Sequence, residues 1–210
     1  KGDPINDEIM FYYPVIVYFI KGFPNESFKK DITQLPEYLQ NILNIDKKMF
    51  GNQLANFEEI TSVLLNYMAK MGTSFLDADD VFNNSFPDLL MDLIKEVGSS
   101  SLQEDSPKNL YMSLRLAIGL LENFPGEVDN YLPPIITMTK EIMDYAVEKQ
   151  NQSVLMAKKL TNVKLQACQV LCMCFWYNET KTMEFLSSNQ GYDVLIKDFI
   201  GCLNLFTSDF

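Results

Sequence analysis

The sequence predicts an all-α protein built from consecutive pairs of helices, and three of its features support this prediction. First, apolar residues recur at intervals of three and four along most of the chain, which is the spacing of one buried helix face. Second, no two-residue hairpin turn such as Asn-Gly or Asp-Gly separates alternating, strand-like segments. Third, the pattern that opens a helix returns about every 50 residues, a period typical of paired helices.

Residues 9–20, IMFYYPVIVYFI, form an uncharged run that begins the first predicted pair. The run is shorter than the roughly 20 apolar residues that a membrane-spanning helix needs, so no membrane insertion is predicted. Residues 19–26 match residues 120–127 in pattern, and the second of these segments follows a strongly periodic helix. We therefore expect 9–20 to be helical, with Pro14 either in its first turn or at a kink.

Further along the chain, five segments carry the spacing of an amphipathic helix. They are 59–71 (Ile60, Val63, Leu64, Tyr67, Met68), 89–97 (Leu89, Leu90, Leu93, Ile94, Val97), 110–124 (Leu110, Leu114, Ala117, Ile118, Leu121), 135–147 (Ile135, Ile136, Ile142, Met143, Ala146) and 165–177. Pro36, Pro87 and Pro133 are each expected in the first turn of a helix, where the N–H that proline lacks would have no intrahelical partner. A fourth opening is expected at Tyr192, without proline.

The spacing of these openings predicts a HEAT- or armadillo-like α-solenoid, an α–α superhelix with about four helix pairs. Pro36 and Pro87 lie 51 residues apart, and Pro87 and Pro133 lie 46 apart. The whole chain, 1–210, is then one solenoid segment. Its approximate repeats are 9–45, 54–97, 108–149 and 159–206. Residues 98–108, GSSSLQEDSPK, are rich in serine and nearly free of apolar residues, so they are predicted to form a mobile loop between two pairs.

Composition and charge exclude some classes of partner. The formal net charge is −11, and Arg115 is the single arginine among 17 basic residues. No surface suited to neutralising phosphates, and hence no direct nucleic-acid binding, is expected from this balance. A basic protein partner fits it better, because opposite potentials steer association.

The sequence offers no arrangement of residues suited to catalysis. Histidine is absent, which removes the commonest general base and the Ser-His and Cys-His pairs. Gly-rich loops that cradle phosphates are also absent. Cys168, Cys172, Cys174 and Cys202 lack the paired spacing of a zinc site and are expected to be buried free thiols. We therefore predict no enzyme activity, no catalytic residues, no cofactor and no metal.

Acidic residues recur on the polar faces of two predicted helices and are the candidate binding residues. They are Asp88, Asp92 and Glu96 in one helix and Glu141, Asp144 and Glu148 in the next pair. The spacing of three or four residues places each set on one helix face. If the second helices of the pairs line one side of the solenoid, both sets face a common groove and contact a basic cargo protein. The alternative is a pair of solvated helix faces without a partner.

Three segments carry a resemblance to a known family. They are FYYPVIVYFIKGFPNESFKKDITQLPEYLQNILNID at 11–46, LRLAIGLLENFPGEVDNYLPPIITMTKEIM at 114–143 and KLQACQVLCMCFWYNETKTMEFL at 164–186. Their apolar positions, together with Pro14 and Pro36, resemble the importin beta superfamily of nuclear transport receptors, the karyopherins. Within it they look like the large importins of the importin seven and eight branch. The resemblance implies a HEAT-repeat segment from the C-terminal half of a receptor several times longer.

What the resemblance implies is a non-enzymatic receptor that shuttles between cytoplasm and nucleus. Such receptors carry cargo through the nuclear pore, bind phenylalanine-glycine (FG) repeats of nucleoporins and release cargo when the GTPase Ran, loaded with GTP, binds. In this family Ran is held chiefly by N-terminal repeats, which this segment would not contain. Cargoes of the branch are often basic, which agrees with the net charge. The alternative is a HEAT-repeat scaffold or adaptor outside nuclear transport, of the phosphatase regulatory subunit or vesicle-coat type.

Overall fold

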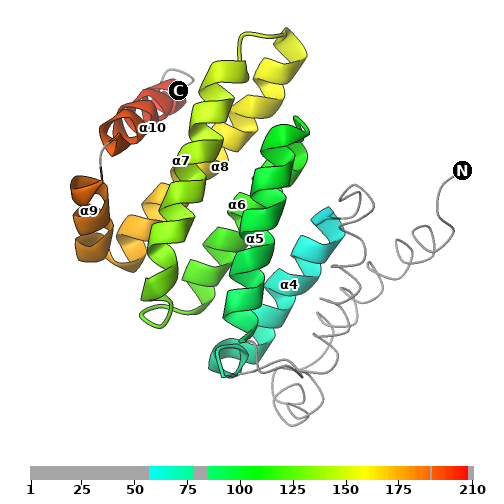
Figure 1. Ribbon diagram of the computed structural model, residues 1–210, viewed down its shortest axis with the longest axis vertical. Helices are drawn as coiled ribbons and strands as arrows, with labels where there is room; N and C mark the ends of the chain where they lie inside the picture. Colours follow the sequence, from blue (N-terminus) through cyan, green and yellow to red (C-terminus); the bar gives the residue numbers. More distant parts are fainter. Residues whose placement is uncertain (1–56, 78–84, 190, 208–210) are drawn as a thin grey trace, which may run out of the picture. The chain divides into compact units, whose positions relative to one another are not determined.

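The computed structural model describes residues 57–77, 85–189 and 191–207. All regular secondary structure in these ranges is helical, which confirms the predicted all-α class (Figure 1). The α-helices are α4 (Phe57–Met71), α5 (Phe86–Gln103), α6 (Pro107–Asn123), α7 (Leu132–Lys149), α8 (Val154–Tyr177), α9 (Glu179–Ser188) and α10 (Tyr192–Thr207), and the 3-10 helices are η1 (Gly72–Phe75) and η2 (Asp129–Tyr131). The predicted helix at 9–20, the predicted repeat at 9–45, Pro14 and Pro36 lie outside the described residues.

The chain divides into two compact units, and the division falls within α5, between Leu93 and Ile94. In the first unit, α4 buries the face that its spacing predicts. The buried side chains of that face are Ile60, Val63, Leu64, Tyr67 and Met68. Close to it in sequence, the rings of Phe75 and Phe86 lie with their centroids 6.1 Å apart. The apolar period of α4 is therefore confirmed as a core-facing stripe.

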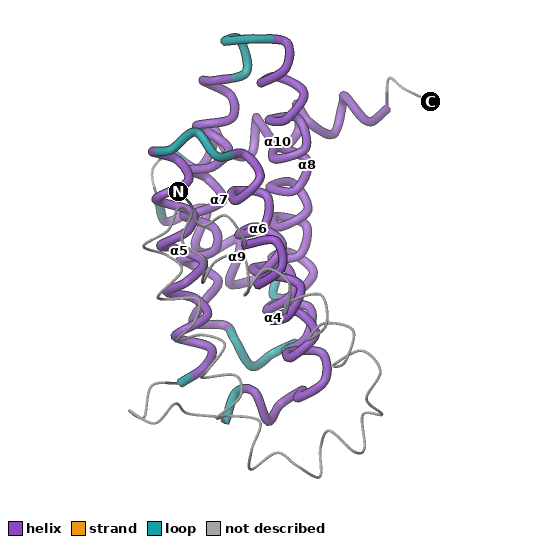
Figure 2. Tube along the Cα trace, turned by 90° about the vertical axis from the view of Figure 1, so that its right-hand side faces the viewer, coloured by secondary structure: helices purple, strands orange, loops and turns teal. Residues whose placement is uncertain are grey.

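In the second unit α8 is the central helix, because it packs along both α6 and α7, which also contact each other. α7 and α8 run side by side from the short turn that joins them (Figure 1). Side chains that these helices bury completely include Leu110, Leu114, Ala117, Leu121, Ile135, Ile136, Ile142, Leu160, Val170 and Leu171. Every described element is helix or loop (Figure 2). This layer is held together by burial of apolar surface from three successive helices.

The prediction of a loop at 98–108 is wrong for most of that range, because α5 continues to Gln103 and α6 begins at Pro107. The polar composition misled the prediction. Val97, Gly98 and Ser101 are buried, so the helix uses small residues on its packed face. A Cβ added at Gly98 would lie 3.5 Å from the sulfur of Met138, so α7 passes close to α5 at this point. Small residues there permit the close approach of two helices.

The real connection between α5 and α6 is a tight turn centred on Asp105. Its φ of 52° is left-handed, a conformation that Asp and Asn tolerate better than most residues. The amide of Ser106 donates to the carbonyl of Ser101 at 3.0 Å, which closes the turn. The Tyr145 hydroxyl donates to Asp105 Oδ1 at 2.9 Å, so the turn is tied to α7.

The predicted helix openings agree with the structure where it is described. Pro87 lies in the first turn of α5 and Pro133 in the first turn of α7. α10 begins at Tyr192, as expected without proline. The predicted repeat at 159–206 needs a correction, however, because it contains parts of three helices instead of two.

The extra break in that repeat falls at Asn178. This residue ends α8 and also caps α9, where its side chain accepts the amide N–H of Lys181 at 3.1 Å. An asparagine side chain at this position satisfies a backbone donor that the new helix would otherwise leave free. The chain therefore restarts as a separate short helix.

Candidate functional site

The three predicted binding residues of α5 are exposed, but Asp88 also has a structural role. The Ser85 hydroxyl donates to Asp88 Oδ2 at 2.6 Å and accepts the Asp88 amide N–H at 3.3 Å. An acidic side chain in the first turn also interacts favourably with the helix dipole. Asp92 and Glu96 are thus the two α5 carboxylates that fit a purely external role.

On α7 the predicted set is less uniform. Glu141 and Glu148 are exposed, whereas Asp144 is half-buried and forms an ion pair with Lys140. The hydrogen bond to Asp144 raises the pKa of Lys140. One of the three charges is therefore neutralised locally. Whether the α5 and α7 sets share a groove stays a prediction, since the division of the chain places Asp88 and Asp92 in the other unit.

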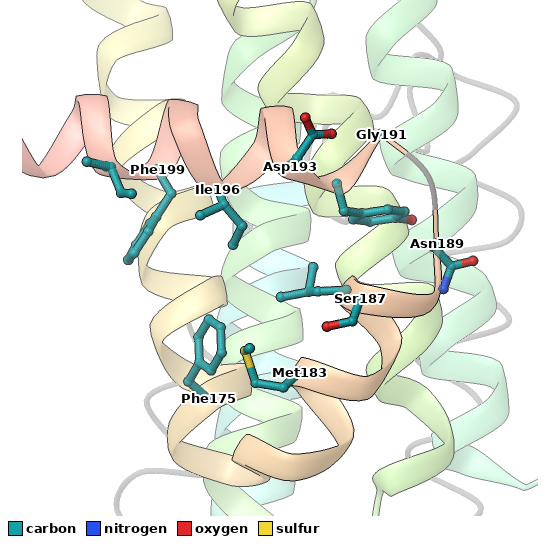
Figure 3. A pocket seen from close by; sticks show the side chains of 11 residues that line it. Phe175, Met183, Ser187, Asn189, Gly191, Asp193, Ile196 and Phe199 are labelled. Carbon is teal, nitrogen blue, oxygen red and sulfur yellow. The ribbon is translucent and has the colours of Figure 1, made fainter.

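A second candidate site is an apolar hollow between the end of α8, α9 and α10, with a volume of about 650 Å³. We call it the terminal groove. Its lining residues are Phe175, Met183, Leu186, Ser187, Asn189, Gly191, Tyr192, Asp193, Ile196, Phe199 and Ile200. In Figure 3, Phe175 and Met183 lie on one side of the hollow, and Ile196 and Phe199 extend from α10 on the other. Its size is in the range of ligand and peptide sites, which is roughly 300–1,000 Å³.

Polar contacts hold α9 in place beside this groove. Asp129 of η2 forms an ion pair with Lys181, and its Oδ1 accepts a hydrogen bond from the side-chain Nδ2 of Asn178 at 3.2 Å. The hydrogen bond from Lys181 lowers the pKa of Asp129. The Val128 amide donates to the Tyr177 hydroxyl at 2.7 Å, and burial raises the pKa of that phenol. The loop before α7 is thereby joined to the junction of α8 and α9.

α10 is anchored mainly through Tyr192. Its hydroxyl lies 3.1 Å from the Thr137 hydroxyl of α7, and its ring meets the Phe185 ring edge-on, with centroids 5.4 Å apart. Leu195 and Cys202, one and three turns further, are buried. The chain reaches Tyr192 through Gly191, whose φ of 87° is unfavourable for any other residue. These contacts leave the Ile196, Phe199 and Ile200 side of α10 turned to the groove (Figure 3).

None of the groove residues was predicted from the sequence. A signal for them is present in α10, where Ile196, Phe199 and Ile200 widen the apolar face that contains Leu195 and Cys202. A helix with so wide an apolar face needs two partners, or leaves part of that face open. The angle at which α10 crosses its neighbours decides between these outcomes, and no local pattern specifies that angle.

The chemistry of the described part of the chain is limited. Among the described residues, no group of three side chains is placed to hold a metal ion. No described helix is both long and apolar enough to cross a membrane. The four cysteines are free thiols, as predicted, but Cys172 is exposed and not buried. Burial raises the pKa of Cys168 and of Cys174 to about 12, so both stay protonated at neutral pH.

Comparison with models of protein families, with curated proteins and with solved structures finds no match to this chain.

Proposed function

We propose that this chain is a protein-binding segment of a nuclear transport receptor of the importin beta type, with its helices stacked as a HEAT-like solenoid. The observation that carries the proposal is the packing of α8 along both α6 and α7. In a solenoid each repeat packs only against its neighbours in sequence. The packing of α8 along the two α-helices that precede it supports the proposal for this reason.

In this proposal the protein works through its surface and not through chemistry. Asp92, Glu96, Glu141 and Glu148 are exposed acidic side chains on α5 and α7 that suit a basic cargo protein. FG-repeat nucleoporins are further partners, and Ran contacts belong to N-terminal repeats of the receptor. The places of action are the cytoplasm, the nucleus and the nuclear pore.

Cargo binding through α5 is tested with a charge-reversal variant and a matched control. The test variant carries Asp92→Lys and Glu96→Lys, and the control carries Glu122→Lys and Glu127→Lys, which are also exposed. Each variant changes the net charge by +4, from −11 to −7, so the two differ only in position. The probe is a fluorescent lysine-rich peptide, and the readout is its anisotropy across salt concentrations.

We expect the α5 variant to bind the peptide about tenfold more weakly at low salt, because two favourable charge contacts become repulsive. The loss should shrink as added salt screens the charges. Equal affinities of the α5 variant and its control for the peptide would show that Asp92 and Glu96 do not take part in cargo binding.

A second measurement separates transport from other scaffold functions. The chain is passed over an immobilised FG-repeat segment of a nucleoporin, with the same segment mutated from phenylalanine to serine as control. Retention that depends on phenylalanine supports the transport proposal. Binding of the basic peptide without such retention favours a HEAT-repeat scaffold outside nuclear transport.

A further inference from the structure

The terminal groove leaves apolar side chains open to solvent. Met183 is 49% exposed and Ile200 is 51% exposed, although both line the hollow. Asp193 lies in the lining, and the exposed Glu184 follows Met183 in sequence on α9, so the helices that form the groove carry two exposed carboxylates. Lys197 comes within 3.8 Å of Asp193, but it is a long and highly exposed side chain that can rotate away. The groove thus suits an apolar segment that carries positive charge.

The same unit contains a segment of this kind at the other end of α8. We call residues 154–159 the α8 tip. Val154 is 90% exposed and Leu155 is 67% exposed, which is unusual for large apolar residues in a helix. Lys158 and Lys159 are exposed as well and follow these two residues at four-residue spacing. Each apolar residue therefore shares its helix face with a lysine one turn later.

The tip of one molecule cannot fill the groove of that same molecule. Val154 and Phe175 are separated by 21 residues of continuous helix, or about 32 Å at 1.5 Å per residue. A straight helix cannot bring its own two ends together. A second copy of the chain has no such restriction.

We propose that the α8 tip of one copy docks into the terminal groove of another. Val154 and Leu155 enter the apolar hollow, while Lys158 and Lys159 face Glu184 and Asp193. Two different surfaces meet in this contact, so it is heterologous, and it extends from copy to copy instead of closing as a symmetric dimer. The contact is small, and we expect it to be weak and dependent on concentration.

The test uses the full chain and two variants, each of which removes one surface. The tip variant carries Val154→Glu and Leu155→Glu, and the groove variant carries Met183→Glu and Ile200→Glu. All four positions are at least 49% exposed, so the fold should persist, and circular dichroism checks that it does. Sedimentation velocity over a range of concentrations measures association.

We expect the unmodified chain to form growing assemblies, and each variant alone to need at least about tenfold higher concentration to associate. A mixture of the two variants should form a one-to-one complex that grows no further, because it contains one intact tip and one intact groove. A chain that stays monomeric throughout, or assemblies that neither variant weakens, would overturn the proposal. So would a groove that binds an FG-repeat peptide while the chain itself remains monomeric.

A charge exchange tests the orientation of the contact. Lys158→Glu with Lys159→Glu should weaken association, and adding Glu184→Lys with Asp193→Lys to the same chain should restore it. Every contact between tip and groove then carries reversed charges, so restoration requires the proposed lysine and carboxylate groups to face one another. A fourfold variant that fails to restore association would contradict this arrangement. The outcome is independent of cargo binding, since Asp92 and Glu96 are unchanged in all these variants.

Discussion

Two parts of the second unit, the α6–α8 layer and the α9–α10 end, contain similar apolar residues but are held in place by different interactions. In the layer, residues such as Leu114, Ile142 and Leu171 have no measurable exposure. At the end, Met183, Val194 and Ile200 are 46% to 51% exposed, and specific polar contacts fix the helices. Burial therefore builds the scaffold, while polar anchors position an apolar surface that remains open.

Two buried hydroxyl groups of the layer form their hydrogen bonds within their own helix. Ser113 and Thr139 lie on packed faces, and each donates to the carbonyl four residues earlier, at 3.0 and 2.7 Å. These groups need no partner from another helix. By contrast, Thr182 of α9 donates to the Cys174 carbonyl of α8 at 2.9 Å, so at the end of the unit a buried hydroxyl joins two elements.

The largest expected effect compares two leucines of α8. Leu171 is fully buried and Leu155 is 67% exposed. Leu171→Ala should lower the free energy of unfolding by about 2–5 kcal/mol, through lost burial and the cavity that remains. Leu155→Ala, the matched control, should change it by less than about 0.5 kcal/mol. Urea titrations followed by circular dichroism measure both free energies of unfolding. Similar decreases for the two variants would contradict the claim that Leu171 belongs to the packed layer and Leu155 to an open tip.

A smaller effect is expected for the anchor of α9. Asp129→Asn keeps the size of the side chain but removes its charge, and should lower the free energy of unfolding by about 1 kcal/mol or less near neutral pH. The folded-state pKa of Asp129 lies below its ordinary value of 3.8, so its stabilising contribution is complete above that pH. The contribution is lost as the pH falls through the lowered pKa.

The measurement for this anchor is the difference in unfolding free energy between the unmodified chain and the variant, followed from neutral to acidic pH. We expect the difference to shrink toward zero at the acidic end. A difference that stays constant across this range would mean that the charge of Asp129 contributes nothing to the anchor.

The smallest effect concerns Ser101 of α5. This side chain is fully buried, and its hydroxyl has no hydrogen-bond partner within the described part of the chain. Ser101→Ala should be neutral or raise the free energy of unfolding by up to about 1 kcal/mol. The control, Ser113→Ala, breaks the bond to the Asn109 carbonyl and should lower it by about 1 kcal/mol. A clear loss of stability in the Ser101 variant would show that the hydroxyl has a partner.

The spacing of apolar residues was sufficient to predict which side chains are buried where one face of a helix packs against the core. Leu110, Leu114 and Leu121 are spaced for one face, and all three are fully buried. The pattern failed at Gly98 and Ser101, since residues that permit close packing of helices are the same ones that suit a loop. The only sign in the sequence of the break between α8 and α9 is Asn178 itself. Asparagine favours the first position of a helix, but it is also common in turns.

The candidate sites also contain features that the sequence could predict and features that it could not. Periodicity placed Asp92, Glu96, Glu141 and Glu148 on exposed faces, because charge and helix spacing are both local properties. It could not foresee the ion pair of Asp144 or the hydrogen bond between the Ser85 hydroxyl and Asp88, which depend on particular rotamers. The terminal groove depends on the crossing of α10 over its neighbours, and that crossing is set by tertiary contacts such as Tyr192 with Thr137.

Amide hydrogen exchange gives the most direct test that a closed helical layer carries an open terminal surface. The account predicts that amides in the middle of α6 and α8 exchange only through global unfolding. Those of α9 and α10 should exchange at least about tenfold faster, through local opening. Equal protection of the two regions would contradict the account, because α9 and α10 would then belong to the same cooperative layer.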